Sequence, residues 1–169
     1  MTGLQPALGA GFGCGTIVGM DSALRPRRSV LFMPGANARA LEKARSIDCD
    51  GIIIDLEDAV APDLKVEARE RTAGVVRGHP YGYREVAIRV NGMDTQWYHD
   101  DLVAAVAAGP DAIAVPKVSS AEQVRAIVAD MEAAGADKSV KLWAMIETPR
   151  AVLDCLDIAE ASDRLTVLI

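Results

Sequence analysis

Residues 51–58 read Gly-Ile-Ile-Ile-Asp-Leu-Glu-Asp, a short apolar run that ends on three acidic side chains. Four other apolar runs also end on a polar or charged residue, and a stretch with helical spacing follows each of them; they occupy 29–35, 86–91, 112–117 and 142–148. Regular alternation of strand and helix predicts a parallel sheet with right-handed crossovers. The strand tips then share one side, where α/β enzymes collect their chemistry.

Two fold classes are compatible with this alternation. A complete (β/α)8 barrel needs ~250 residues, so the 169-residue chain would supply a truncated TIM barrel of about five and a half βα units. A five-stranded open parallel sheet of the flavodoxin type fits the length better, but it gathers its ligands at one switch point. Polar residues at every tip favour the truncated barrel. We expect strands at 29–33, 51–55, 85–90, 111–115 and 140–146, and the start of a sixth at Leu165.

The segments between these strands carry helix signals. Asn37 is expected to cap a helix that runs through Arg45, and Ser119 or Ser120 to cap a later one. The residue pattern predicts further helices at 63–77, 95–108 and 149–161, the second of them ended by Gly109-Pro110.

Composition argues against some classes of function. The net charge of −6 and the scattered basic residues speak against nucleic acid as a partner. No stretch approaches the ~20 apolar residues of a membrane span. The three cysteines follow no pairing pattern, which predicts reduced thiols in a cytoplasmic protein. We expect residues 1–28 to be a flexible or miscalled extension ahead of a folded domain at 29–169.

The acidic tip at residues 55–58 is the first candidate for chemistry. In extended geometry Asp55 and Glu57 share a face, while Asp58 turns away. Clustered carboxylates raise one another's proton affinity unless a cation lies among them. Acidic residues at a helix start or in a solvated turn would be the simpler interpretation of the same pattern.

Three further side chains at strand tips are candidates. Arg89 lies in an apolar context, where a guanidinium suits a substrate carboxylate or pairs with Asp55 or Glu57 for structure alone. Lys117 approaches the same space or extends into solvent from the surface. Glu147 ends a buried strand, which suits a Mg²⁺ ligand, although it can also cap the following helix.

Taken in order, these segments resemble the successive strand motifs of citrate lyase beta-subunit-like proteins. These proteins belong to the HpcH/HpaI aldolase and CoA-ester lyase group, which includes malyl-CoA lyases. The resemblance runs from about Arg27 to the last residue and keeps both order and spacing. The motifs that carry it are Arg-Ser-Val-Leu-Phe-Met-Pro-Gly at 28–35, Asp-Leu-Glu-Asp-Ala-Val at 55–60, Arg-Val-Asn at 89–91, Val-Pro-Lys-Val at 115–118 and Ile-Glu-Thr-Pro at 146–149.

The resemblance implies a homo-oligomeric (β/α)8 barrel that cleaves a carbon–carbon bond in 3-hydroxyacyl-CoA thioesters and yields an acyl-CoA and an oxo acid. Mg²⁺ would chelate the oxo acid, with Glu147 as its ligand. Arg89 would hold the substrate carboxylate, and Lys117 would lie in the same catalytic space. Further positions implied by the resemblance are Asp55, Glu57 and Asp58 around the pocket, and Arg39 and Lys43 near the nucleotide end of CoA.

The sequence departs from the family pattern at its end. The resemblance places a second metal ligand, an Asp, in a loop after the sixth strand, and this chain stops at Ile169. We therefore expect a truncated form with open edge strands and little activity of its own. The rival functions are a pyruvate-type class II aldolase that uses no CoA and a non-catalytic α/β binding module.

Overall fold

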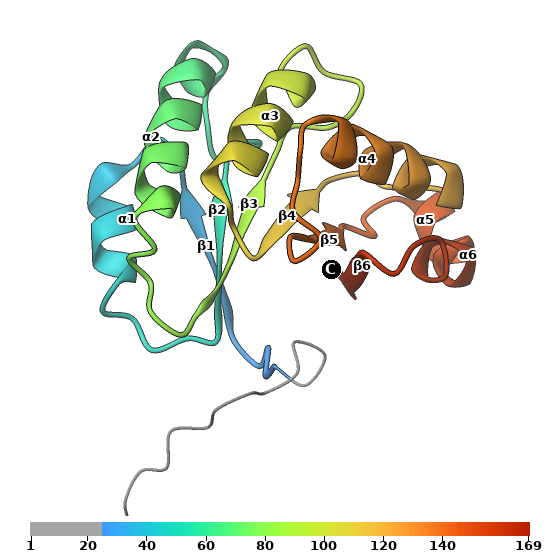
Figure 1. Cartoon of the computed structure of the whole chain (residues 1–169), viewed down its shortest axis with the longest axis horizontal. Coiled ribbons are helices and arrows are strands. Elements are labelled where there is room, and N and C mark those ends of the chain that lie inside the picture. Colours follow the sequence, from blue (N-terminus) through green and yellow to red (C-terminus); the bar gives the residue numbers. More distant parts are fainter. Residues whose placement is uncertain (1–24) are drawn as a thin grey trace, which may run out of the picture.

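The computed structural model describes residues 25–169 (Figure 1). It contains one sheet of six parallel strands, and the strands lie side by side in sequence order. The strands are β1 (Val30–Pro34), β2 (Gly51–Asp55), β3 (Glu85–Arg89), β4 (Ala112–Val115), β5 (Lys141–Ala144) and β6 (Leu165–Leu168). The helices between them are α1 (Ala38–Ala44), η2 (Pro62–Leu64), α2 (Lys65–Arg77), α3 (Tyr98–Ala108), α4 (Ala121–Ala133), α5 (Pro149–Leu153) and α6 (Cys155–Ala159).

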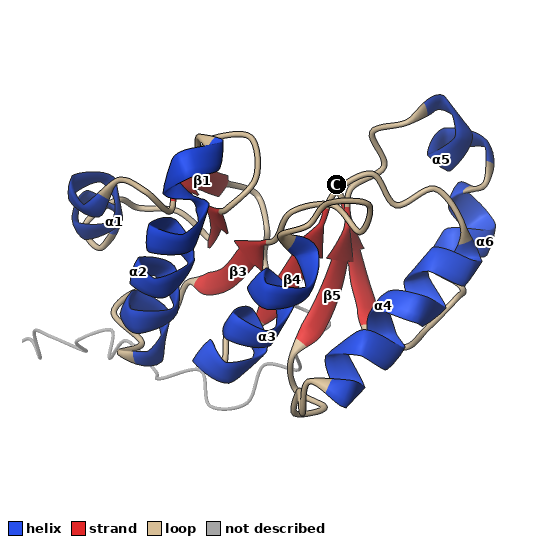
Figure 2. Ribbon diagram, turned by 90° about the horizontal axis from the view of Figure 1, so that it is seen from above, coloured by secondary structure: helices blue, strands red, loops and turns tan. Residues whose placement is uncertain are grey.

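The strand order decides between the two predicted fold classes. A flavodoxin-type sheet has the order 2-1-3-4-5 and carries helices on both faces. Here each strand pairs with the next, so right-handed crossovers place the helices on one face. Helices α2, α3 and α4 line the outside of the curved sheet (Figures 1 and 2). The partial barrel is therefore confirmed. Within residues 25–169 the sheet does not close, and β1 and β6 are its edges.

The two faces of the sheet bury different side chains. Successive residues of a strand point to opposite faces, and the helix-covered face carries the larger hydrophobic cluster, which includes Ile52, Ile54 and Ile88. The inner face carries a small cluster in which Trp143 meets Ile53 and three alanines, Ala87, Ala112 and Ala114. One large ring thus fills a space that its neighbours leave open.

Several predicted helix ends agree with the structure. Asn37 accepts the Ala40 N–H and caps α1, and Ser120, rather than Ser119, caps α4. Gly109 ends α3 with a φ of 67°, in the left-handed region that favours glycine. The segment 149–161 is not one helix but two, because Asp154 has a ψ of 15° and interrupts it.

Three arginines tie the start of the described chain to the amino ends of the strands. Arg27 donates two hydrogen bonds to buried Glu85, at 2.6 and 2.8 Å. Arg28 pairs with Asp50, and Arg25 pairs with Asp111. Residues 25–28, which we assigned to an extension, thus contact the sheet. The rest of that prediction, for residues 1–24, lies outside the described residues.

A first prediction concerns Gly35, which follows β1. A Cβ atom at this position would lie 2.6 Å from Thr72 Oγ1 and 3.0 Å from the Asp55 carbonyl oxygen. Gly35→Ala should therefore lower the free energy of unfolding by about 1–3 kcal/mol, the usual cost of overpacking. Urea unfolding monitored by circular dichroism measures the loss.

Gly74→Ala is the matched control, because a Cβ atom there meets nothing within 4 Å on the exposed side of α2. Alanine in a helix interior stabilises by about 0.5–1 kcal/mol relative to glycine. Equal effects of the two substitutions would contradict the prediction.

Candidate active site

The candidate residues are brought together by the parallel register of β2 and β3. Asp55, the last residue of β2, lies directly opposite Arg89, the last residue of β3. Leu56 continues the pairing, since its N–H donates to the Arg89 carbonyl at 2.9 Å. The acidic tip and the arginine therefore meet at the carboxyl ends of the strands, as the sequence predicts.

Asp55 and Arg89 form a buried, two-point ion pair. Arg89 Nε and Nη2 each donate to an Asp55 carboxylate oxygen at 2.6 Å, and Asp55 is 1% exposed and Arg89 8%. Burial alone would raise the pKa of Asp55, but hydrogen bonds from Arg89 and from the N–H groups of Glu57 and Ala59 outweigh it and hold this pKa below its usual value.

Glu57 lies between two cations. Its Oε2 is 3.1 Å from Arg89 Nη1, and its Oε1 accepts a hydrogen bond of 3.0 Å from Lys117 Nζ. The hydrogen bond and the charge of Glu57 raise the pKa of Lys117. Lys117 also has a φ of 56°, a left-handed conformation that is uncommon outside glycine and that concentrates at functional sites. Because Glu57 is buried, the solvated-turn interpretation of this tip is wrong for Asp55 and Glu57.

Glu147 lies just beyond β5 and is exposed. Its Oε1 accepts the Lys117 backbone N–H at 2.8 Å. The residue that caps α5 is Thr148, whose side chain accepts the Ala151 N–H, so the rival capping role falls to Thr148. Within residues 25–169, Glu147 forms no ion pair, which leaves its carboxylate available for a cation.

The carboxylates of Asp55, Glu57 and Glu147 limit the kind of metal site that these residues could form. Among the described residues no group of three or more His, Cys, Asp or Glu side chains gathers around a common point. Asp55 and Glu57 are already neutralised by Arg89 and Lys117. The arrangement suits a Mg²⁺ ion held by Glu147 and several waters, since Mg²⁺ commonly takes only one or two protein carboxylates.

Three predicted site residues make no hydrogen bond or ion pair with this cluster, although the charge of Asp58 helps to raise the pKa values of Arg89 and Lys117. Asp58 is exposed, and none of its side-chain atoms makes a hydrogen bond or ion pair within residues 25–169. Arg39 and Lys43 lie on the exposed side of α1, likewise without such partners in the described part of the chain. Their assignment to CoA binding stays a prediction.

Sequence reasoning missed Lys65, a buried residue beneath the acidic tip. A signal for it exists, because Lys65, Ala68, Thr72 and Val76 recur at helical spacing and are all buried on α2. A lysine that falls in such a stripe of apolar and small residues is predicted to be buried, and a buried lysine needs specific partners.

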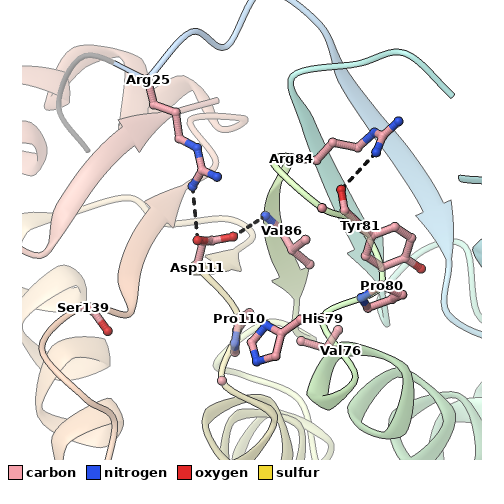
Figure 3. Close-up of a pocket in the computed structure, with 12 residues that line it drawn as sticks. Arg25, Val76, His79, Pro80, Tyr81, Arg84, Val86, Pro110, Asp111 and Ser139 are labelled. Carbon is pink, nitrogen blue, oxygen red and sulfur yellow. Dashed lines mark hydrogen bonds and ion pairs between the residues drawn. The ribbon is translucent and has the colours of Figure 1, made fainter. Parts of the chain in front are cut away.

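One cavity lies at the opposite end of the sheet (Figure 3). It has a volume of about 240 Å³, and its lining includes Arg25, His79 and Asp111. Arg25 pairs with Asp111, which also accepts the Val86 N–H at 2.8 Å. Arg25 and Asp111 therefore already have partners, and the cavity contains none of the predicted site residues.

Comparison with known proteins matches the sequence to one family and the fold to the same group. The model of the HpcH/HpaI aldolase/citrate lyase family matches residues 28–169. A (3S)-malyl-CoA thioesterase of Cereibacter sphaeroides is 47% identical over 150 residues, which cover 89% of this chain and 50% of that protein. The citrate lyase beta subunit of Leuconostoc mesenteroides is 35% identical over 146 residues, covering 83% and 48% of the two chains.

Comparison with solved structures indicates the same fold. The citrate lyase beta subunit of M. tuberculosis, complexed with oxaloacetate and magnesium, superposes with a TM-score of 0.63 at 28% identity, over 84% of this chain and 58% of that one. A Haloferax volcanii malate synthase shares the fold, with a TM-score of 0.67 at 20% identity, over 83% and 49% of the chains. The chain spans about half the length of the curated relatives it matches. It belongs to the HpcH/HpaI aldolase/citrate lyase family.

Proposed function

We propose that these five βα units and the sixth strand belong to a Mg²⁺-dependent carbon–carbon lyase. Its substrate would be a 3-hydroxyacyl-CoA thioester of the malyl or citryl type, and its products an acyl-CoA and an oxo acid. We further propose a cytoplasmic homo-oligomer. The observation that carries the proposal is the position of Glu147, a carboxylate free of ion pairs within residues 25–169, beside the Asp55–Arg89–Glu57–Lys117 cluster.

The side chains divide into two groups by role. Glu147 would hold the metal, which when bound acts as a Lewis acid on the oxo-acid carbonyl. Arg89 would attract the substrate carboxylate, and its guanidinium is held in place by Asp55. Lys117 would add positive charge where the oxo acid binds, since its side chain is about half exposed. Arg39 and Lys43 would contact the nucleotide of CoA. The relatives that support this proposal include an L-malyl-CoA/beta-methylmalyl-CoA lyase, 35% identical over 151 residues.

A thioesterase is the second candidate. It is favoured by the (3S)-malyl-CoA thioesterases, which are 46–48% identical to this chain, a higher identity than the lyase shows. Product analysis separates the two reactions. The protein is incubated with malyl-CoA and Mg²⁺. A lyase would release acetyl-CoA and glyoxylate, whereas a thioesterase would release malate and free CoA.

The metal assignment predicts a loss of binding. Titration calorimetry of the chain with MgCl₂ in the presence of oxaloacetate should show binding, and Glu147→Gln should weaken it by about tenfold or more, because a neutral amide replaces the only charged protein ligand assigned here. Glu132→Gln, on the exposed surface of α4, is the control and should bind normally. Equal binding by Glu147→Gln would overturn the metal assignment.

A further inference from the structure

Lys65 is a buried lysine whose side chain donates hydrogen bonds to two backbone carbonyls of the acidic tip and to Asn91, which follows β3. The residue begins α2 and is 5% exposed. Its Nζ donates to the Leu56 carbonyl at 2.8 Å, to the Glu57 carbonyl at 2.7 Å and to Asn91 Oδ1 at 2.7 Å. An ammonium has three N–H groups, and here each has an oxygen partner.

This arrangement has a cost that packing alone does not explain. Burial lowers the pKa of Lys65, because it disfavours the charged form, while Asp101 and Asp55 act in the opposite direction. An apolar side chain of similar length would fill the same space without removing a charge from water. What an apolar side chain cannot do is hold two successive carbonyl groups of the tip.

Asn91 extends the same network to α3. Its Nδ2 donates to the Leu56 carbonyl at 2.9 Å, and its backbone N–H donates to Asp101 Oδ2 at 3.1 Å. Asp101 is fully buried and accepts a hydrogen bond of 2.7 Å from Arg69 Nε on α2. Two outer helices are thus tied to the peptide groups on either side of Glu57.

Fixing these two peptide groups fixes the direction in which the Glu57 side chain leaves the backbone. That side chain reaches Arg89 Nη1 and Lys117 Nζ, which the proposed function uses. We propose that Lys65 is a positioning residue, which holds the Leu56 and Glu57 carbonyls so that the Glu57 carboxylate stays between Arg89 and Lys117. The inference rests on the proposed function only in that it takes this tip to be a binding site.

Amide hydrogen exchange of the unliganded chain tests the role of Lys65. In Lys65→Met, the N–H groups of Leu56, Glu57 and Ala59 should exchange about tenfold faster or more, because the hydrogen bonds that order the tip are lost. The N–H groups of β4, such as those of Ile113 and Ala114, should keep most of their protection. A role in overall stability alone would instead accelerate exchange across the whole sheet.

Lys138→Met is the matched control, since Lys138 is exposed and its side chain makes no hydrogen bond within residues 25–169. If Lys65→Met fails to fold, Lys65→Gln takes its place, because an amide has two N–H groups for three acceptors and must leave at least one unbonded. Unchanged protection at the tip, or a uniform loss across the sheet, in the folded variant would overturn the proposal. Neither result bears on metal binding, because no metal or substrate is present.

Discussion

Arg89→Met is expected to lower the free energy of unfolding by about 3–5 kcal/mol, because it leaves the buried Asp55 carboxylate without its cation. Arg89 supplies two of the four hydrogen bonds that Asp55 accepts and also balances Glu57. Asp55 stays buried in the variant, so the cost of removing its charge from water is no longer offset by the attraction of the guanidinium. Equilibrium unfolding in urea at pH 7 measures the difference.

Arg125→Met provides the control for this variant. Arg125 pairs with Glu122 on the surface of α4, and the two side chains are 56% and 79% exposed. A surface pair of this kind is worth about 0–1 kcal/mol. A loss of similar size in both variants would contradict the buried-pair argument.

The same pair predicts a pH dependence. The folded-state pKa of Asp55 is lowered, so the pair contributes stability that is present above the unfolded pKa of about 3.9 and is lost as the pH falls through the folded value. In Arg89→Met, the Asp55 carboxylate is still buried but has no guanidinium beside it. Protonation of Asp55 then removes the free-energy cost of burying its charge. The difference in stability between wild type and variant should therefore narrow as the pH falls from 7 toward and below the unfolded pKa of about 3.9. A constant difference over that range would contradict the assignment to Asp55.

The sequence predicted the bounds of a strand best where every residue of that strand is buried. β2 has the predicted bounds, and its five residues are all buried. Gly109 and Asn37 correctly indicated two helix ends. A left-handed residue at a helix C-terminus and a side-chain cap at an N-terminus both depend only on the local backbone. The division at Asp154 was missed, since the break depends on how this segment meets the rest of the fold, which spacing along one helix does not record.

The partners of each charged side chain were harder to predict. Whether Arg89 pairs with Asp55 was left open, because that depends on the register between β2 and β3, and a shift of one residue would move Arg89 to the other face. Lys65 was overlooked because lysines in a charged helical segment usually face solvent. Its partners are backbone carbonyls, which any residue type supplies, so no side-chain motif indicates them.

The inner face of the sheet depends on one side chain, Trp143. Its ring is 1% exposed and packs beside Ile53, and the alanines around it are too short to reach across the space it fills. Trp143→Ala should therefore cost about 3–5 kcal/mol, because it removes a large buried surface and leaves a cavity that rigid strand backbones cannot collapse. Arg27 would also lose the ring over which its guanidinium lies, 5.7 Å from the centroid. Urea unfolding followed by circular dichroism measures the loss.

Trp97→Ala is the control, since the chain has only two tryptophans and Trp97 is half-buried at the start of α3. It should cost less, because part of the ring already contacts water. In Trp143→Ala, Trp97 is the remaining tryptophan, so its fluorescence emission reports whether the tip near Lys65, which lies 5.3 Å from the Trp97 ring, is still ordered.

The cavity left by Trp143→Ala can be tested with a second substitution on the inner face of the sheet. If the residues of that face pack as a unit, Ala87→Val should recover part of the stability that Trp143→Ala loses. In the wild type, where the space is already filled, Ala87→Val should be destabilising. Destabilisation by Ala87→Val in both backgrounds would show that the strands themselves close the cavity.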